Sequence, residues 1–537
     1  MITVTPQGQI YLCKTPLEND YKNQLTFNNK NSQLNYFNST VQQTFDNYTY
    51  IKKDNVIKVG INIDKIIDCN YLFYRNVGFP DDENSIRIYY CFITNMEYIN
   101  ENCTAITFET DCFQTWYFDI SYKRCFVERE HVNSDEIGEH TIPEGLELGE
   151  YVSAKDCEKI LESPDDFYIC MAVTELPDSS VPAYSNHRTY NAIFGGLYYL
   201  VFKTANNCEK AISIYDHFGK ADAINSIFMI PKDLTAITDG TTVTWQTSNI
   251  SCSLIYPVGS DEADTIGTLN GEMPTKLGKN YTPTNNKLFT YPFSYMVLTN
   301  NSGTSEIFRY EDFDIDDITG ERVLSWWVDA SITPGMSMKA IPLFYKNINT
   351  NYNYGIMLGK TPVCSWNSDV YVNWLTQNGL NNALNVLNNG VSAGLGLATL
   401  NPTQTLSGLT GIYNSMHQFT LADMTPNQAR GNTNAGDINF SENNDGGATL
   451  YYISVRDEMA QIIDKYFNMF GYKVNDVKIP NITGRQNWNY VKTIDCNFDG
   501  NIPQSDLNII KTMFNNGVTL WHSANAMYNY SLSNDIV

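Results

Sequence analysis

The chain has 537 residues, which is too long for one ordinary hydrophobic core, so we expect two to four domains. Its formal net charge of −24 at pH 7 excludes a sequence-reading nucleic-acid protein, because such a protein needs a basic surface. DNA as cargo remains compatible with this charge, since an acidic channel wall lets a polyanion pass without binding it.

The first twenty residues, "MITVTPQGQIYLCKTPLEND", lack a basic start, an apolar core and a small-residue cleavage site. We therefore expect no secretory signal and synthesis in the cytosol. The chain has twelve cysteines, with no CxxC pair and no histidines at metal-binding spacing. In a reducing compartment this pattern predicts buried free thiols rather than a disulfide framework.

The N-terminal region alternates apolar and polar side chains with the two-residue period of half-buried strands. The clearest segments are "NVIKVGINID" (55–64), "SIRIYYCFITNMEYI" (85–99) and "TAITFETDCFQTWYFDI" (104–120). Strands of this kind close into barrels or sandwiches. The sequence therefore predicts a mainly β fold of the α+β class, built from β-barrel or β-sandwich domains.

A four-residue cluster of charged side chains follows, namely Glu128, Arg129, Glu130 and His131. It offers an acid, a base and a cation, but alternation along a strand places the two glutamates on one face and Arg129 and His131 on the other. We interpret the cluster as a solvated or intersubunit ion-pair strand rather than a catalytic site.

Composition changes along the chain suggest where domains begin and end. The strand pattern stops at a Pro- and Ser-rich patch near residue 165, and new strands such as "GLYYLVFKT", "TTVTWQT" and "SYMVLTN" follow it. A further change comes near "WWVDASITPGMSMKAIPLFY". We predict an N-terminal β-rich domain, a middle β-rich domain, a return to the first domain, a long apolar loop and a C-terminal segment with two helices, over residues 1–164, 165–345, 346–372, 373–447 and 448–537.

The apolar loop lies between the predicted strands "SDVYVNWL" and "ATLYYISVR". From Val370 through Ala422 it contains no Asp, Glu, Lys or Arg, and His417 is its only side chain that titrates near neutral pH. Such a segment can enter lipid without carrying a charge, which would cost about 2.5–3.5 kcal/mol at the bilayer centre. Asn, Ser and Thr interrupt its apolar runs below the ~18 residues of a transmembrane helix, so we expect that one copy alone does not span. The candidate membrane-active residues are Leu380, Leu384, Leu387, Val391, Leu395, Leu397, Leu400, Leu406, Leu409 and Ile412.

Two other interpretations of this region are possible. It could be a disordered surface loop, although so many apolar side chains need a site that hides them from water. Residues 390–394 also spell GxSxG, but a nucleophile elbow needs a buried strand before the serine, and "ALNVLNN" is a poor strand. We interpret the GxSxG match as a coincidence of small residues.

Two helices are predicted near the C-terminus. Between 456 and 470 apolar residues recur at three- and four-residue steps, and Gly471 follows at the position where helices end in a left-handed residue. The second helix runs from Asp506 to about Asn515, with Ser505 as its cap and Asn516-Gly517 as its stop.

The segment "DCNFDGNIPQSD" fits a calcium loop, with Asp495, Asn497, Asp499 and Asp506 at ligand positions. Against a metal, a strand rather than a helix precedes the segment, and Asp506 is shorter than the usual bidentate glutamate. Without a metal, residues 499–501 form a turn and Ser505 caps the helix. We assign no metal or cofactor, and the sequence leaves calcium binding open.

These residues resemble a known family. The C-terminal run "YFNMFGYKVNDVKIPNITGRQNWNYVKTIDCNF", followed by "DLNIIKTMFNNGVTLWH", is similar to the end of the tail knob, or distal tail tube, proteins of small picovirus-type short-tailed phages. The segments "ENDYKNQLTF", "ETDCFQTWYFDI", "CFVEREHV" and "EGLELGEY" follow the family in the same order. The resemblance covers roughly the first 155 and the last 90 residues.

The resemblance implies a structural virion protein rather than an enzyme. Members of this family assemble as six-fold tubes at the tail tip, and each subunit inserts an apolar loop that plugs the lumen until it is released to act on the host membrane. We therefore expect a homohexamer made in the host bacterial cytoplasm and placed at the distal end of the tail. Its expected partners are an upper tail tube or collar, receptor-binding appendages, the host cell membrane, and genomic DNA that passes through the lumen without specific binding.

A second function class competes with this one. The richness in Tyr, Trp and Asn and the dockerin-like loop also fit an extracellular carbohydrate-binding or glycoside-cleaving protein. Asp314 and Asp316 are its candidate carboxylates. The lack of a predicted signal peptide and the single calcium-like loop argue against this class.

Overall fold

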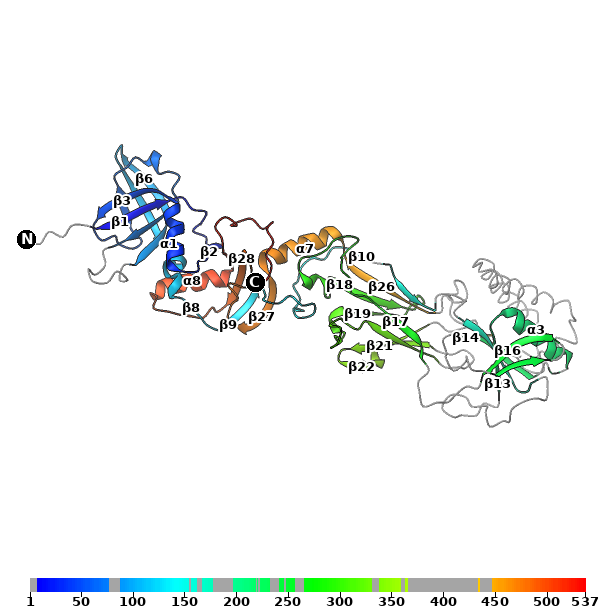
Figure 1. Cartoon of the computed structure of the whole chain (residues 1–537). Helices are drawn as coiled ribbons and strands as arrows, with labels where there is room; N and C mark the ends of the chain where they lie inside the picture. The colour runs from blue at the N-terminus through cyan, green and yellow to red at the C-terminus, as the bar shows by residue number, and fades with distance from the viewer. Residues whose placement is uncertain are drawn as a thin grey trace, which may run out of the picture. The chain divides into compact units, whose positions relative to one another are not determined.

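The chain forms two compact units in the computed structural model (Figure 1). The structure describes residues 7–76, 87–153, 156–161, 167–176, 197–218, 220, 223–231, 241–245, 248–255, 265–330, 338–358, 363–365, 433–434 and 447–537. Unit 1 comprises residues 1–148, 283–288 and 458–537, and unit 2 comprises residues 149–282 and 289–457. The N-terminal and C-terminal parts of the chain therefore fold together.

A six-stranded antiparallel sheet forms the N-terminal part of unit 1. Its strands, in spatial order, are β3 (Val41–Tyr48), β1 (Gly8–Cys13), β5 (Tyr71–Arg75), β6 (Ile88–Asn100), β7 (Cys103–Thr110) and β4 (Val56–Val59). The hydroxyl of Tyr48 on β3 donates to the carbonyl oxygen of Lys58 on β4 at 2.9 Å, so the two edge strands of the curled sheet approach each other. Alternate side chains of its strands fill one apolar core that includes Ile10, Leu72 and Phe108.

The second sheet of unit 1 is assembled from both ends of the chain. Its order is β2 (Asn23–Leu25), β30 (Val518–Trp521), β28 (Trp488–Ile494), β9 (Cys125–Glu130) and β27 (Tyr472–Lys478). Strand β2 pairs with β30 in parallel, with Leu25 opposite Trp521. A separate two-stranded pair joins β8 (Ser121–Tyr122) to β29 (Phe498–Asp499). Trp488 and Trp521 are fully buried where this sheet meets the N-terminal strands.

Four helices accompany the sheets of unit 1 among its described residues: α1 (Lys30–Ser39), α2 (Cys112–Trp116), α7 (Asp457–Phe470) and α8 (Gln504–Asn516). The two predicted C-terminal helices are thus present. Helix α1 was not predicted, because its Asn- and Ser-rich sequence has little amphipathic pattern; Asn29 and Ser32 form a capping box at its start.

Unit 2 contains two five-stranded sheets over a shared aromatic core. The first consists of β10 (Tyr151–Ser153), β26 (Ala448–Val455), β18 (Ser294–Thr299) and β19 (Ser305–Phe308), with β11 (Glu158–Ile160) also on β26. The second consists of β17 (Thr265–Asn270), β20 (Ser325–Ala330), β21 (Met338–Tyr345) and β22 (Ile348–Thr350), with β23 (Ile356–Met357) also on β21. Phe308, Trp326 and Tyr345 are buried in their common core.

A seven-stranded sheet completes unit 2. Its order is β15 (Thr241–Trp245), β16 (Ser248–Ile255), β13 (Tyr198–Phe202), β12 (Phe167–Val173), β14 (Ile224–Pro231), β24 (Val363–Ser365) and β25 (Thr433–Asn434). Helix α3 (Ala205–His217) packs on it through Cys208, Ala211 and Tyr215, which share an apolar cluster with Leu200 and Phe202.

The prediction of a mainly β fold is confirmed, and so are most of the predicted strands. Two strand predictions are wrong in part. The segment "NVIKVGINID" is a strand only over β4 (Val56–Val59), and a short 3-10 helix, Ile63–Lys65, begins within it. The segment "TAITFETDCFQTWYFDI" is a strand only as far as Thr110, because Asp111 accepts a hydrogen bond from the Gln114 backbone N–H at 3.1 Å and so begins helix α2. The ten cysteines that the structure records in its described part are free thiols, as predicted.

Candidate functional site

The ten predicted membrane-active residues, from Leu380 to Ile412, lie outside the described residues, as do the GxSxG segment, His417 and the predicted strand "SDVYVNWL". The predicted strand on the other side, "ATLYYISVR", is confirmed as β26. Within the described part of the chain, no helix has both the length and the apolar character needed to cross a membrane.

The two ends of segment 366–432 are held side by side. Strand β24 precedes the segment and β25 follows it, and the two pair antiparallel, with Val363 opposite Asn434 and Cys364 opposite Thr433. Strand β24 is also paired with β14 in the seven-stranded sheet. The described residues on the two sides of the segment are therefore paired with each other at one edge of the seven-stranded sheet.

The predicted ion-pair strand is buried inside unit 1, and the expectation of a solvated or intersubunit strand is wrong. Arg129 is 8% exposed and Glu144 has a side chain that is 1% exposed. Glu144 forms ion pairs with both Arg129 and Lys287 and accepts from the Lys473 backbone N–H at 3.0 Å. Arg129 also donates to the carbonyl oxygen of Gly471 at 2.7 Å. Sequence spacing could not show this, because the partners come from three distant segments.

His131 is a structural residue of the same buried network. Its Nδ1 accepts a hydrogen bond from the Tyr490 backbone N–H at 2.7 Å, so its Nε2 carries the proton and donates to the carbonyl oxygen of Asn468 at 3.0 Å. Burial, aided by the nearby Arg485, lowers the pKa of His131 to about 3. Because both nitrogens of the neutral imidazole are hydrogen-bonded to the backbone, His131 has a structural role and is not a proton-transfer group.

Asp506, the last ligand of the predicted calcium loop, is buried and bonded to other side chains. Asp506 has a side chain that is 1% exposed; it forms an ion pair with Lys53 and accepts from Trp116 Nε1 at 2.8 Å. Burial raises the pKa of Asp506, but the hydrogen bonds from Lys53, Trp116 and Ser505 outweigh it, so the pKa is lowered overall. Ser505 donates to Asp506 and does not cap the helix, which begins after Pro503 without a side-chain cap. In the described residues, no group of three or more His, Cys, Asp or Glu side chains is placed to bind a metal ion.

The two aspartates considered for glycoside cleavage, Asp314 and Asp316, lie in unit 2. Asp316 accepts from the Ile318 backbone N–H at 2.8 Å and so stabilises a turn. The backbone of Asp314 pairs with Phe344 and Val323.

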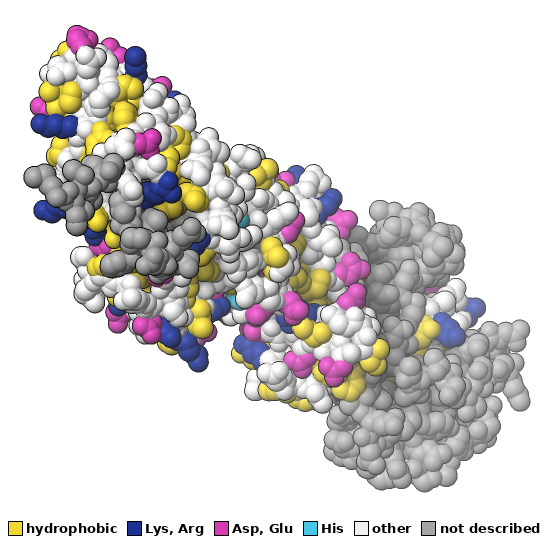
Figure 2. All heavy atoms as spheres, turned by 60° about the vertical axis from the view of Figure 1, so that its left-hand side comes forward, with side chains coloured by type: hydrophobic (Ala, Val, Ile, Leu, Met, Phe, Trp, Pro, Cys, Tyr) yellow, Lys and Arg dark blue, Asp and Glu magenta, His cyan; other side chains and the backbone are white. Residues whose placement is uncertain are grey.

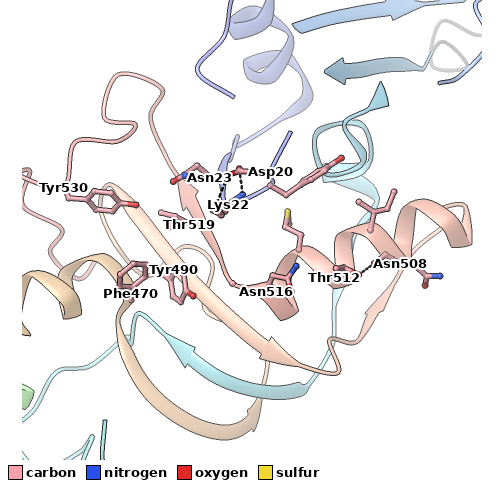
Figure 3. Close-up of a pocket in the computed structure, with 14 residues that line it drawn as sticks. Asp20, Lys22, Asn23, Phe470, Tyr490, Asn508, Thr512, Asn516, Thr519 and Tyr530 are labelled. Atoms are coloured by element: carbon pink, nitrogen blue, oxygen red, sulfur yellow. Dashed lines mark hydrogen bonds and ion pairs between the residues drawn. The ribbon is translucent and has the colours of Figure 1, made fainter. Parts of the chain in front are cut away.

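An open cavity of about 780 Å³ lies in unit 1, between residues 20–23, helix α8 and the C-terminal segment (Figure 3). Aromatic rings of Phe470, Tyr490 and Tyr530 gather at one end of it, and Asn508 and Thr512 lie at the other (Figure 3). We call this cavity the α8 groove. The groove could not be predicted from the sequence, because its lining residues come from both ends of the chain.

Three polar groups of the α8 groove are held in place by neighbours. Asp20 forms an ion pair with Lys22 at 3.1 Å and accepts from the Lys22 backbone N–H at 3.0 Å. The side-chain amide of Gln504 donates to Asn508 Oδ1 at 2.9 Å, so the NH₂ group of Asn508 points away from Gln504. Thr512 donates to the Asn508 carbonyl oxygen at 2.9 Å.

Sequence analysis also missed Asp464 of helix α7, which is 2% exposed. It accepts from the backbone N–H and hydroxyl of Thr284, both at 2.9 Å, and from the backbone N–H and side-chain amide of Asn285, at 3.1 and 2.8 Å. Segment 283–288 is thereby fixed within unit 1. The only sequence feature that pointed to a buried role for Asp464 was the position of an acidic residue on the apolar face of a predicted helix.

Comparison with known proteins identifies relatives over the whole chain. Residues 258–535 match the family described as the C-terminal domain of tail knob protein gp9 of Bacillus phage phi29. Residues 9–122 match the N-terminus of the caudoviral major tail protein family. The tail knob proteins gp9 of Bacillus phages PZA and phi29 are each 25% identical to the chain, over 98% of its length and 98% of theirs.

The fold is also seen in a solved structure. The tail knob protein gp12 of bacteriophage C1 aligns with a TM-score of 0.66 and 16% sequence identity, over 99% of this chain and 100% of that one.

Proposed function

The chain belongs to the phage tail knob protein family represented by gp9 of Bacillus phage phi29, and from this premise we propose that it forms the distal tube of a short tail, plugged by its apolar loop. It is a structural component of the virion tail rather than an enzyme, and it associates with other tail proteins. Under the proposal, six copies surround a lumen through which the genome leaves, and segment 373–447 closes that lumen until it is released into the host membrane.

The absence of charge from Val370 through Ala422 carries this proposal. In a chain with a net charge of −24, a stretch of this length without Asp, Glu, Lys or Arg fits a segment that must change its surroundings from protein to lipid. The pairing of β24 with β25 supports it, because the loop can leave the lumen while its two ends stay anchored.

The charge of the rest of the chain suits a DNA conduit. On the face that Figure 2 shows, Lys and Arg side chains are interspersed with Asp and Glu side chains. Because Asp and Glu outnumber Lys and Arg by 59 to 35, the tube wall would let DNA pass without binding it. We propose that residues 1–164, 346–372 and 448–537 contribute to the tube wall and residues 165–345 to a knob domain. This boundary passes through sheets of unit 2, where β26 pairs with β18 and β23 pairs with β21.

Leakage of a dye from liposomes tests the membrane part of the proposal. The first variant replaces residues 366–432 by a short Gly-Ser linker and keeps β25, so that β24 and β25 become a simple hairpin. The deletion should leave assembly intact and abolish leakage. Leakage that is undiminished by the deletion would place the membrane activity elsewhere in the chain.

A charge-placing double variant makes the test sharper. Leu395→Lys with Leu397→Glu preserves the net charge but adds two ions that must enter lipid, at about 2.5–3.5 kcal/mol each near the bilayer centre. The matched control, Leu395→Gln with Leu397→Gln, removes the same apolar side chains without adding charge. We expect the Lys/Glu variant to leak far less than the Gln/Gln control. Equal leakage from the two variants would contradict insertion of this part of the loop.

A further inference from the structure

The α8 groove has a lining that neither the tube nor the membrane-active loop requires. Its volume of about 780 Å³ lies within the range of roughly 300–1,000 Å³ that is usual for small-ligand sites. All of its lining residues belong to unit 1. They come from residues 20–23, the end of α7, β28, α8 and the segment that follows α8. The groove therefore exists within one compact unit of a single chain.

The lining is electrically neutral overall. Asp20 and Lys22 are the only charged residues among the described residues that line it, and they pair with each other at 3.1 Å. A phosphate-bearing ligand would find no unpaired cation here, and the net charge of −24 on the chain would repel it. The occupant that suits the groove is uncharged.

The two ends of the groove differ in chemistry. Phe470 and Tyr490 form an edge-to-face pair with ring centroids 5.1 Å apart, and Tyr530 lies beside them (Figure 3). Asn508 and Asn516, both exposed, add side-chain amides along α8. A suitable ligand has apolar C–H faces to place on the aromatic rings and several hydroxyl groups to bond to amides and a carboxylate.

Several of these groups are fixed before a ligand arrives. A Cβ atom at Gly517 would lie 2.1 Å from the Tyr490 hydroxyl, so the glycine leaves room for that ring to sit against the end of α8. The φ of 92° at Gly517 also favours glycine. Asp20 is held by two contacts from Lys22. Binding would therefore order few side chains and lose little conformational entropy.

From this neutral, half-aromatic and half-amide lining we propose that the α8 groove binds an uncharged oligosaccharide. Sugar rings stack their C–H faces on Phe470, Tyr490 and Tyr530, and their hydroxyls bond to Asp20 and to the amides of α8. The site adds carbohydrate recognition to the tail knob protein and does not depend on the apolar loop. A peptide from a second copy of the chain is the competing occupant.

Isothermal titration of the full-length protein with tetra-N-acetylchitotetraose and, separately, with maltotetraose tests the proposal. We expect saturable binding of at least one of the two sugars, with a Kd in the range of about 0.1–1 mM, which is typical of few hydrogen bonds and modest apolar contact. Absence of saturable binding of both sugars up to several millimolar would overturn the proposal.

Two variants of the α8 groove test whether the sugar binds there. Asn508→Ala with Asn516→Ala removes two exposed amides from the groove and should weaken binding about tenfold, the effect of roughly 1.4 kcal/mol. Tyr490→Phe removes one hydroxyl and keeps the ring, so it should weaken binding less. The control, Lys511→Ala, lies on the same helix but outside the groove lining and should bind like the unaltered chain. Sugar binding that both groove variants leave unchanged would refute the assignment, and a changed oligomeric state without sugar binding would make the groove a subunit interface.

Discussion

Replacing His131 by asparagine should change how the stability of unit 1 depends on pH. An asparagine oxygen can keep the hydrogen bond from the Tyr490 backbone N–H, but the variant loses the bond to the Asn468 carbonyl oxygen and leaves some empty space. At pH 7 we therefore expect the variant to be less stable by about 1–3 kcal/mol.

The same substitution should remove a source of acid sensitivity. The pKa of His131 falls from 6.5 in the unfolded chain to about 3 in the fold, so below pH 6.5 the unfolded chain binds a proton that the folded chain does not. Stability is then lost as the pH falls from 6.5 toward 3. At about 1.4 kcal/mol per pKa unit, the loss is on the order of 4–5 kcal/mol.

The two effects have opposite signs, so the stability difference between the two proteins should shrink on acidification and reverse between about pH 6 and pH 4. Urea unfolding, followed by tryptophan fluorescence at one fixed protein concentration, measures this; Trp488 reports directly, because its Nε1 donates to the same Asn468 carbonyl oxygen at 2.9 Å. A stability difference that stays constant between pH 7 and pH 4 would show that His131 is not a buried, neutral imidazole in the folded protein.

Two further predictions concern buried carboxylates of unit 1. Burial raises the pKa of Asp111 to about 7, so between about pH 4 and pH 7 the folded chain holds a proton that the unfolded chain releases, and stability falls as the pH rises. The variant Asp111→Asn should show a smaller fall in its urea-unfolding midpoint over this pH range. An unchanged dependence of the midpoint on pH would contradict the prediction. Glu144→Gln leaves Arg129 and Lys287 buried without a full counter-charge, so it should cost about 3–5 kcal/mol in the same assay, and a loss below 1 kcal/mol would show that the network is not buried in solution.

Local features of the C-terminal helices could be predicted because their signals lie in neighbouring residues. Helix α7 ends at Phe470, and Gly471 has the predicted left-handed conformation, with a φ of 64°. The packing reason was not predictable: a Cβ at Gly471 would lie 2.1 Å from the carbonyl oxygen of Glu130, which is far away in the sequence. Ile462 is one of the apolar residues whose three- and four-residue spacing predicted an apolar helix face between 456 and 470, but it is 61% exposed.

Interactions between distant segments could not be predicted from one sequence. The charges around Arg129 appeared solvated, because a charged strand is usually on a surface and its partners Glu144 and Lys287 are not marked by any local pattern. Asp506 fitted a calcium loop for the same reason, since its ion pair with Lys53 joins the two ends of the chain. The α8 groove could not be predicted for the same reason, because its lining combines residues near the two ends of the chain.

Electron microscopy of the purified full-length protein, beside the variant that lacks residues 366–432, would show whether the chain forms a plugged six-fold tube. We expect both proteins to form hollow six-fold rings, with density inside the lumen of the full-length ring and an open lumen in the variant. A full-length ring with an empty lumen, or particles without six-fold symmetry, would contradict the assignment of this chain as a plugged distal tail tube.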